Sequence, residues 1–347
     1  MNDLPLLCRP AALLALAALL SACSAAHFGA GLIPTPATTP TAPGAAYSSR
    51  PDSSQLTYSV SFYLNQIVGF LLSANGNATP SVVVSGSKTK LNQPDALAID
   101  RSSGKLFVAN GAYQDHRILI FPKGSNGNTA PQTLAGSNVP IQSTGGLAVD
   151  SSGNLYVSDY LAKAIFVFAA GASGNAAPIR TIAGTSTGFV QPYGMAFDSQ
   201  GHLYVAQGHD DAAPIEEFAA LAGGNVAPIA TIGGSHTKLL GVTNVVLDKH
   251  DRIIVPNGGS IEVFAAGAHG NVSPAATIKG SNTTIADVTT VGTDSNGSIY
   301  CTNAINISQL KFSLIVFGSN ANGNVAPARI LSGSHTHIVD NVYPTTY

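Results

Sequence analysis

The chain has 347 residues and a formal net charge of −2, and only 10% of its residues are charged. It holds no run of Lys or Arg, which excludes the electrostatic footprint of a nucleic-acid-binding protein, so we expect no nucleic-acid partner. Gly, Ser, Thr, Asn and Val are abundant, whereas helical stripes of Leu, Glu and Lys are missing. This composition favours short strands joined by tight turns.

The N-terminal segment has the pattern of an export signal. Residues 11–20 form an apolar run of signal-peptide length that is too short to span a bilayer. The run leads into Leu20-Ser21-Ala22-Cys23, which resembles the bacterial lipobox, where the cysteine thiol is acylated and the leader is removed before it. The resemblance implies a lipoprotein signal peptide at 1–22 and a palmitate-type anchor on Cys23, and Ser24 implies the outer membrane. The alternative is an ordinary secretory leader that is cut nearby.

Residues 23–54 are predicted to link this anchor to a folded domain. Pro, Thr, Ala and Ser dominate the segment and no periodicity is present, so it buries too little apolar surface to offset its ordering entropy. We therefore expect a protein of the cell envelope with the lipid membrane as one partner. Its folded part, residues 55–347, is expected in the periplasm or outside the cell.

Two short elements recur in phase through the folded part, and such self-similarity indicates a repeat architecture. The first is Gly-Asn-x-x-Pro, with its Asn at 77, 128, 175, 225, 271 and 324. The second is Gly followed by Ser or Thr, at Gly86, Gly136, Gly184, Gly234, Gly280 and Gly333. An apolar stretch ending in Phe precedes each Gly-Asn element, and these stretches end at residues 70, 121, 168, 218, 264 and 317. Six copies of one structural unit follow from this count.

The third copy predicts the unit most clearly. Strands are expected at 146–150, 154–159, 165–168 and 179–183, with a tight turn at Gly153 and a further hairpin at Gly174-Asn175. Four short antiparallel strands in about 49 residues form the blade of a propeller. The first copy lacks its first strand, and residues 338–347 resemble a lone first strand. We therefore predict an all-β, six-bladed β-propeller closed by a blade shared between the N- and C-termini.

The repeat resembles a known family at these positions. Gly146-Leu-Ala-Val-Asp150, Gly153-Asn-Leu-Tyr-Val-Ser-Asp159 and Asp115-His116-Arg117-Ile118 are similar to the NHL repeat. The resemblance implies an NHL-like propeller, here in a bacterial lipoprotein. It implies no single activity, because a fold does not fix a function.

The candidate ligand-binding residues lie at one rim of the expected channel, where the loops joining second to third strands and outer strand to next blade meet. One polar residue per blade ends the second strand near this rim: Ser61, Asn110, Asp159, Gln207, Asn257 and Asn303. A second set begins the innermost strands close by: Asp95, Tyr193, Thr243, Thr289 and Asp340. Such a ring can bind a sugar, a peptide or an ion. The alternative is that these side chains only satisfy backbone groups at strand ends.

A metal site and a set of turn residues are also predicted. His209 and Asp211, with His236 one loop onward, can supply two imidazoles and a carboxylate to a divalent metal, although their spacing matches no defined zinc pattern. We expect no cofactor, with this metal as the alternative. An Asp also ends the first strand in five blades, and there we expect it to accept N–H groups of its own turn. These residues are Asp100, Asp150, Asp198, Asp248 and Asp294. Cys301 lies in an apolar strand and is expected to be a small buried hydrophobe.

Enzymes with similar propellers carry residues that this chain lacks. Gluconolactonase-like propellers hold calcium with a Glu from the start of the chain, whereas the only Glu residues here fall in third strands. Streptogramin-lyase-like propellers carry Trp, which is missing, and amidating lyases bind zinc through a set of His. We therefore predict a non-catalytic propeller that binds a protein, peptide or carbohydrate at the channel rim. The alternative is a hydrolase or lyase that uses a metal at the rim.

Overall fold

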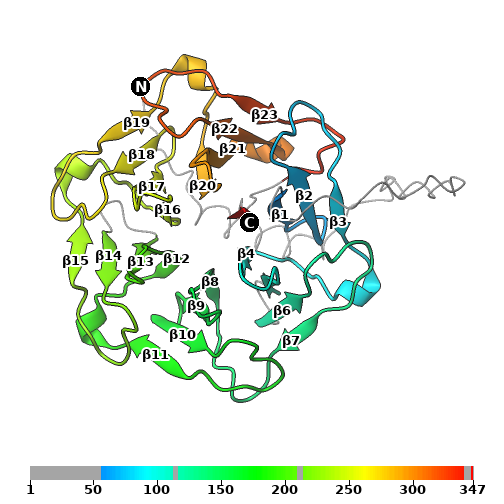
Figure 1. Cartoon of the computed structure of the whole chain (residues 1–347), viewed down its shortest axis with the longest axis vertical. Helices are drawn as coiled ribbons and strands as arrows, with labels where there is room; N and C mark the ends of the chain where they lie inside the picture. Colours follow the sequence, from blue (N-terminus) through cyan, green and yellow to red (C-terminus); the bar gives the residue numbers. More distant parts are fainter. Residues whose placement is uncertain (1–55, 112–115, 209–213, 340–344, 347) are drawn as a thin grey trace, which may run out of the picture. The chain divides into compact units, whose positions relative to one another are not determined.

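The computed structural model describes residues 56–111, 116–208, 214–339 and 345–346. In these residues six four-stranded antiparallel sheets stand as blades around a central axis (Figure 1). The strands of each blade are given from the innermost outward. Blade 1 consists of β24 (Thr345–Thr346), β1 (Leu56–Ser61), β2 (Gln66–Leu71) and β3 (Val82–Val84). Blade 2 consists of β4 (Ala96–Ile99), β5 (Leu106–Asn110), β6 (Arg117–Phe121) and β7 (Gln132–Leu134), and blade 3 of β8 (Thr144–Val149), β9 (Leu155–Asp159), β10 (Ala164–Phe168) and β11 (Arg180–Ala183). In the same order, blade 4 is β12 (Pro192–Phe197), β13 (Leu203–Gln207), β14 (Ile215–Phe218) and β15 (Ala230–Ile232); blade 5 is β16 (Val246–Leu247), β17 (Ile253–Pro256), β18 (Ile261–Phe264) and β19 (Ala276–Ile278); and blade 6 is β20 (Val288–Thr293), β21 (Ile299–Asn306), β22 (Lys311–Phe317) and β23 (Arg329–Leu331). The predicted six-bladed, all-β propeller is confirmed.

Both faces of each sheet are buried against neighbouring blades, which explains why the strands are continuous apolar runs. The apolar cluster between blades 2 and 3, for example, joins Phe107 and Ile118 to Leu155 and Phe168. The Phe that ends each third strand is buried completely or almost completely in all six blades. These residues are Phe70, Phe121, Phe168, Phe218, Phe264 and Phe317. The repeated Phe is therefore a core residue. Cys301 is also buried, as expected, and burial raises the pKa of its thiol.

The Asp that ends the innermost strand organises the following turn. Asp150 Oδ1 accepts the backbone N–H groups of Ser152 and Asn154, both at 2.9 Å. Asp198, Asp248 and Asp294 accept the equivalent pair, and Asp100 accepts two N–H groups and two serine hydroxyls. The predicted turn role of this Asp is confirmed.

The two repeated glycine elements meet at the boundary between adjacent blades. Asn175 of blade 3 lies against Gly136, which follows the outer strand of blade 2, and its Oδ1 accepts the N–H of Asn138 at 2.7 Å. Gly136 has a φ of 134°, and a Cβ there would lie 2.4 Å from that oxygen, so this position requires glycine. We call this contact the boundary clasp. It recurs at every boundary, from Asn128 to Lys88, Asn175 to Asn138, Asn225 to Ser186, Asn271 to His236, Asn324 to Asn282 and Asn77 to His335.

The clasp corrects one detail of the sequence analysis. Gly174-Asn175 was expected to form the turn between the third and outer strands, but that turn lies at residues 169–172, where Ala172 N–H donates to the Ala169 carbonyl. The Gly-Asn pair instead forms a parallel bridge to Leu134 of blade 2. The Gly-Asn pair therefore connects adjacent blades and does not form the turn within its own blade.

Blade 1 closes the ring in two places. At its inner edge Thr345 and Thr346 of β24 pair with Tyr58 and Thr57 of β1. At its outer edge the sixth clasp joins His335 N–H to Asn77 Oδ1 at 2.8 Å, across 258 residues of sequence. The predicted blade shared by both termini is confirmed. No helix within the described residues is long and apolar enough to cross a membrane.

Candidate functional site

The two ends of the ring differ in what they expose. We call the end that carries the β9–β10-type loops and the loops between blades the rim end. The opposite end, which carries the turn Asp residues, is the hairpin end. The polar residues predicted for the rim do end their second strands there. Ser61, Asn110, Asp159, Gln207 and Asn303 are buried, and Asn257 is half-buried.

Most of these side chains hold the loop that enters their blade. Asn110 Oδ1 accepts the N–H of Asn92 at 2.7 Å, and its Nδ2 donates to the carbonyl of Lys90 at 3.1 Å. Asn257 and Asn303 make equivalent bonds. Gln207 Oε1 also accepts from the entering loop, but its Nε2 donates to Glu216 Oε2. Asp159 accepts two N–H groups from the entering loop and two from its own β9–β10 loop. Ser61 differs, because its Oγ accepts the N–H of Leu64 in its own loop. These contacts are the backbone role that the sequence left as an alternative. Direct ligand binding by these residues stays a prediction.

Some of the side chains that begin the innermost strands have polar atoms without hydrogen-bond partners among the described residues. Asp95 Oδ1 is shielded from solvent and has no hydrogen-bond partner among the described residues, and burial raises the pKa of Asp95 to about 7. The Tyr193 ring stacks on Tyr160 with centroids 5.3 Å apart and planes 4° from parallel. Burial, followed by Tyr160 and Asp95, raises the pKa of Tyr193. Thr289 is buried and its hydroxyl lacks a partner among the described residues, Thr243 is half-buried, and Asp340 lies outside the described residues.

The predicted metal residues are only partly described. His209 and Asp211 lie outside the described residues, and so does Cys23. His236 is exposed and takes part in a boundary clasp through its backbone N–H. The metal at the rim therefore stays a prediction.

A different trio of potential metal ligands lies at the hairpin end of blade 4. His202 Nδ1 lies 2.9 Å from Asp198 Oδ2 and 3.3 Å from Glu217 Oε1. These three residues are the one such trio within the described ranges. In blades 3 and 5 the side chains in the His202 position, Asn154 and Arg252, make the same bond to their turn Asp. Valine or isoleucine occupies the Glu217 position in blades 2, 3, 5 and 6. The contact between Asp198 and His202 is therefore part of the hairpin, and only Glu217 is particular to blade 4.

The rim end gathers most of the large apolar side chains that the described residues expose. Seven of eleven lie in its loops or, for Ile305, at the end of β21: Tyr63, Leu64, Leu161, Val190, Leu240, Ile305 and Leu310. Leu161 is the most exposed of them, at 62%. The other four, Leu71, Ile179, Leu221 and Ile229, lie where third strands turn into outer strands. We call the group of seven the apolar rim set. Sequence analysis missed it, although Tyr63, Leu161 and Ile305 share one position, two residues after the strand-end polar residue of blades 1, 3 and 6.

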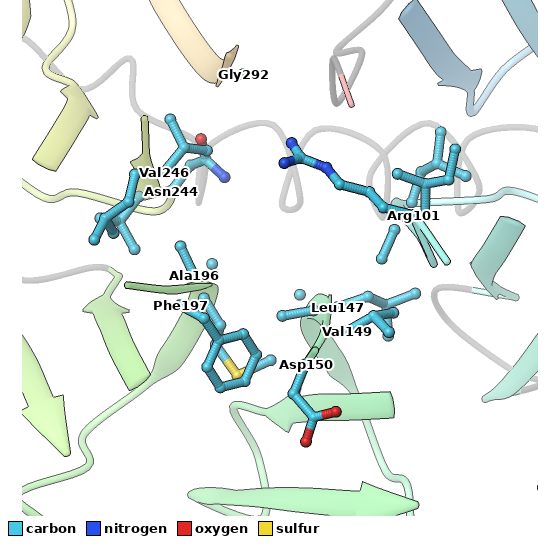
Figure 2. Close-up of a pocket in the computed structure, with 18 of the residues that line it drawn as sticks. Arg101, Leu147, Val149, Asp150, Ala196, Phe197, Asn244, Val246 and Gly292 are labelled. Carbon is cyan, nitrogen blue, oxygen red and sulfur yellow. The ribbon is translucent and has the colours of Figure 1, made fainter. Parts of the chain in front are cut away.

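A cavity of about 490 Å³ occupies the channel between β4, β8, β12, β16 and β20. It reaches the hairpin end, where Arg101, Ser102 and Ser151 are exposed. Figure 2 shows Arg101 pointing into this space, with apolar side chains around it. Sequence analysis missed Arg101 as well. The available signal was its departure from the repeat, because Ser151, Ser199 and Ser295 occupy the same turn position in blades 3, 4 and 6.

No protein-family model matches the chain, and no curated protein matches its sequence. The crystal structure of a protein of unknown function from Bacteroides caccae is similar, with a TM-score of 0.57 and 9% identity over 84% of this chain and 98% of that one. The RRP9 WD40 repeats and U3-55K each give a TM-score of 0.48 and 14% identity over 72% of this chain, covering 65% and 66% of their own. At 9% identity the first similarity shows a shared fold and says nothing of function.

Proposed function

We propose that this chain is a lipid-anchored, non-catalytic propeller of the bacterial cell envelope, of the NHL-repeat type, which binds a protein or peptide partner on its rim end. The apolar rim set carries this proposal. Exposed apolar side chains concentrated on one face are typical of protein interaction sites, in which a few such anchors supply most of the binding energy.

The chemistry of the rim favours a protein or peptide over a carbohydrate. Six of the seven exposed residues are aliphatic, and aliphatic side chains pack against other apolar side chains. Exposed lysines surround them, at positions 90, 163, 238 and 311. Apolar anchors within a polar surround resemble the anatomy of a protein–protein interface. The strand-end residues support this role by fixing the loops that present the anchors.

The proposed partner is tested by comparing the proteins that the wild type, a rim variant and a control variant capture. Full-length protein is cross-linked in intact cells and compared with the rim variant Leu161→Ser/Leu240→Ser. The matched control is Leu221→Ser/Ile229→Ser, which removes two equally exposed apolar side chains outside the rim end. We expect a partner that the wild type and the control retain and that the rim variant loses by at least tenfold. A set of captured proteins that is the same for all three would contradict the proposal.

The membrane anchor is tested separately. Wild-type protein is expected to incorporate labelled palmitate and to sediment with outer membranes. Cys23→Ala protein is expected to incorporate none and to leave the membrane fraction. Cys23→Ala protein that stays with the membrane would contradict lipidation at this residue.

One observation favours the alternative of an enzyme. A carboxyl group whose pKa burial raises to about 7, and which has one shielded oxygen without a partner among the described residues, has the properties of a general acid or base; Asp95 is such a group and lies beside Tyr193 at the channel mouth. An Asp95→Asn variant separates the two functions. Partner capture unaffected by this change is expected for a binding protein, whereas loss of a hydrolase or lyase activity on a purified substrate would establish the alternative.

A further inference from the structure

The channel cavity has the size and the walls of a small-molecule site. Its volume of about 490 Å³ lies within the range of ligand pockets, roughly 300–1,000 Å³. Leu147, Val149, Phe197, Val246 and Val291 contribute apolar side chains to its walls, which are apolar and polar in about equal measure. The cavity opens at the hairpin end, so a ligand would enter on the side opposite to the apolar rim set.

Arg101 brings a positive charge to this cavity. Its guanidinium points into the cavity (Figure 2), and it forms no hydrogen bond or ion pair with any residue that the structure describes. Burial within the cavity lowers the pKa of Arg101, although the side chain remains exposed at the hairpin end. The two turn carboxylates that line the cavity are engaged elsewhere, because Asp100 accepts from its own turn and Asp150 points away from the cavity. A guanidinium without a partner in such a cavity favours an anion.

Asn244 adds a second donor group on another wall. Its Oδ1 accepts the backbone N–H of Val291 at 3.0 Å, which fixes the orientation of the amide. Nδ2 therefore faces the other way, and Figure 2 shows the amide nitrogen directed toward the cavity. Among the described residues Nδ2 has no acceptor. The polar side-chain atoms that Arg101 and Asn244 direct into the cavity are thus hydrogen-bond donors.

From these contacts we infer that the channel binds a small organic monocarboxylate with an apolar body, entering from the hairpin end. The carboxylate lies against the Arg101 guanidinium, whose planar array of donors matches its two oxygens. The hydrocarbon part fills the space between the innermost strands. This site is independent of the proposed partner surface, because it uses other residues at the other end of the ring.

The repeat supplies matched variants for the test. Arg101→Ser introduces the residue that blades 3, 4 and 6 carry in this position, so it is compatible with the fold. Lys249→Ser makes the equivalent change in blade 5 and removes an exposed cation at the same end, but Lys249 does not line the cavity. The probes are hexanoate and benzoate, with the uncharged hexanamide and benzamide as controls. Binding to the full-length chain is measured by isothermal titration calorimetry, and the unfolding temperature of each variant is recorded.

We expect saturable binding of a carboxylate probe, at least tenfold weaker binding of the matching amide, and at least tenfold weaker binding of the carboxylate to Arg101→Ser. Lys249→Ser and the rim variant Leu161→Ser/Leu240→Ser are expected to bind like the wild type. Three results would overturn the inference: no saturable binding of either carboxylate up to 10 mM (a concentration of the order of the weakest specific affinities), equal binding of acid and amide, or unchanged binding in Arg101→Ser. Because the rim variant is a separate arm, failure here leaves the partner proposal unaffected, and the reverse also holds.

Discussion

The hairpin end and the rim end hold their loops with the same chemistry but over different distances. At the hairpin end an aspartate accepts N–H groups within four residues of itself, in five blades of the ring. At the rim end the holding residue varies between Asn, Asp and Gln, and it reaches back 16 to 18 residues to the loop entering the blade. The aspartate at the hairpin end stabilises a local turn, whereas the buried residue at the rim end anchors a loop that is distant in sequence. The side chains that anchor these loops are buried below them, and the exposed apolar residues lie on the outer side of the rim end.

The sharpest test of this difference is Asp159→Ala at the rim end. Asp159 is fully buried, and the substitution leaves the N–H groups of Gln142, Ser143, Leu161 and Ala162 without their acceptor. We expect the free energy of unfolding, measured with guanidinium chloride, to fall by about 3–4 kcal/mol. Asp159→Asn keeps one acceptor oxygen and should lose less. A loss below about 1 kcal/mol in Asp159→Ala would show that water replaces these bonds readily.

The pH dependence of stability provides a second test at the rim end, at Glu216. Burial raises the pKa of Glu216 to about 7, although Gln207 Nε2 donates to its Oε2 at 2.6 Å and lowers it. The folded chain therefore binds a proton more tightly than the unfolded chain, so stability is highest below the ordinary Glu pKa and falls as pH rises to about 7. Each such group contributes a slope of at most about 1.4 kcal/mol per pH unit.

In Glu216→Gln this contribution is absent, so we expect the free energy of unfolding to fall less steeply between pH 5 and 7 than in the wild type. Guanidinium titrations at half-unit intervals measure both slopes. The slope that remains is assigned to Asp95, whose pKa is also raised to about 7 by burial. Identical slopes in the two proteins would contradict a neutral Glu216 in the fold.

The smallest effect is expected for Asp150→Ala at the hairpin end. Asp150 is half-buried, and the N–H groups that it releases at Ser152 and Asn154 lie in a surface turn that water can reach. The expected loss in the free energy of unfolding is about 1–2 kcal/mol. A loss as large as that of Asp159→Ala would remove the distinction between a local turn and an anchored loop.

The fold could be predicted from the sequence because its main determinants are local and repeated. The Gly-Asn element, the Gly-Ser/Thr element and the Phe near the end of the third strand each occur once per blade, so counting them gave the number of blades. The boundary clasp was not predicted, since it joins Asn175 to Gly136 and neither residue indicates its partner on its own. Both looked like turn residues, which is what Gly and Asn most often are.

The candidate sites were harder to predict for the same reason. Repetition drew attention to Asn110, Asp159 and Asn303, but a polar residue that recurs at a strand end is the residue most needed by the backbone. Arg101 interrupts the repeat and therefore gave no pattern, and the apolar position of Leu161 recurs only in blades 1 and 6, as Tyr63 and Ile305. Whether a given interruption points into a channel or out to solvent depends on side-chain direction, which only the assembled ring reveals.

Ring closure also has a consequence for how this chain is synthesised and folded. Blades 2 to 6 can each complete their sheets within about 50 residues, as soon as that segment has emerged. β1 is the first described strand of the chain, yet its inner-edge partner β24 lies at residues 345–346. During synthesis β1 therefore carries an open edge, which is a template for pairing with other chains. The step that removes this aggregation hazard has the longest sequence separation among the described strand pairs, so closure is expected to be slow and to benefit from a chaperone that covers β1.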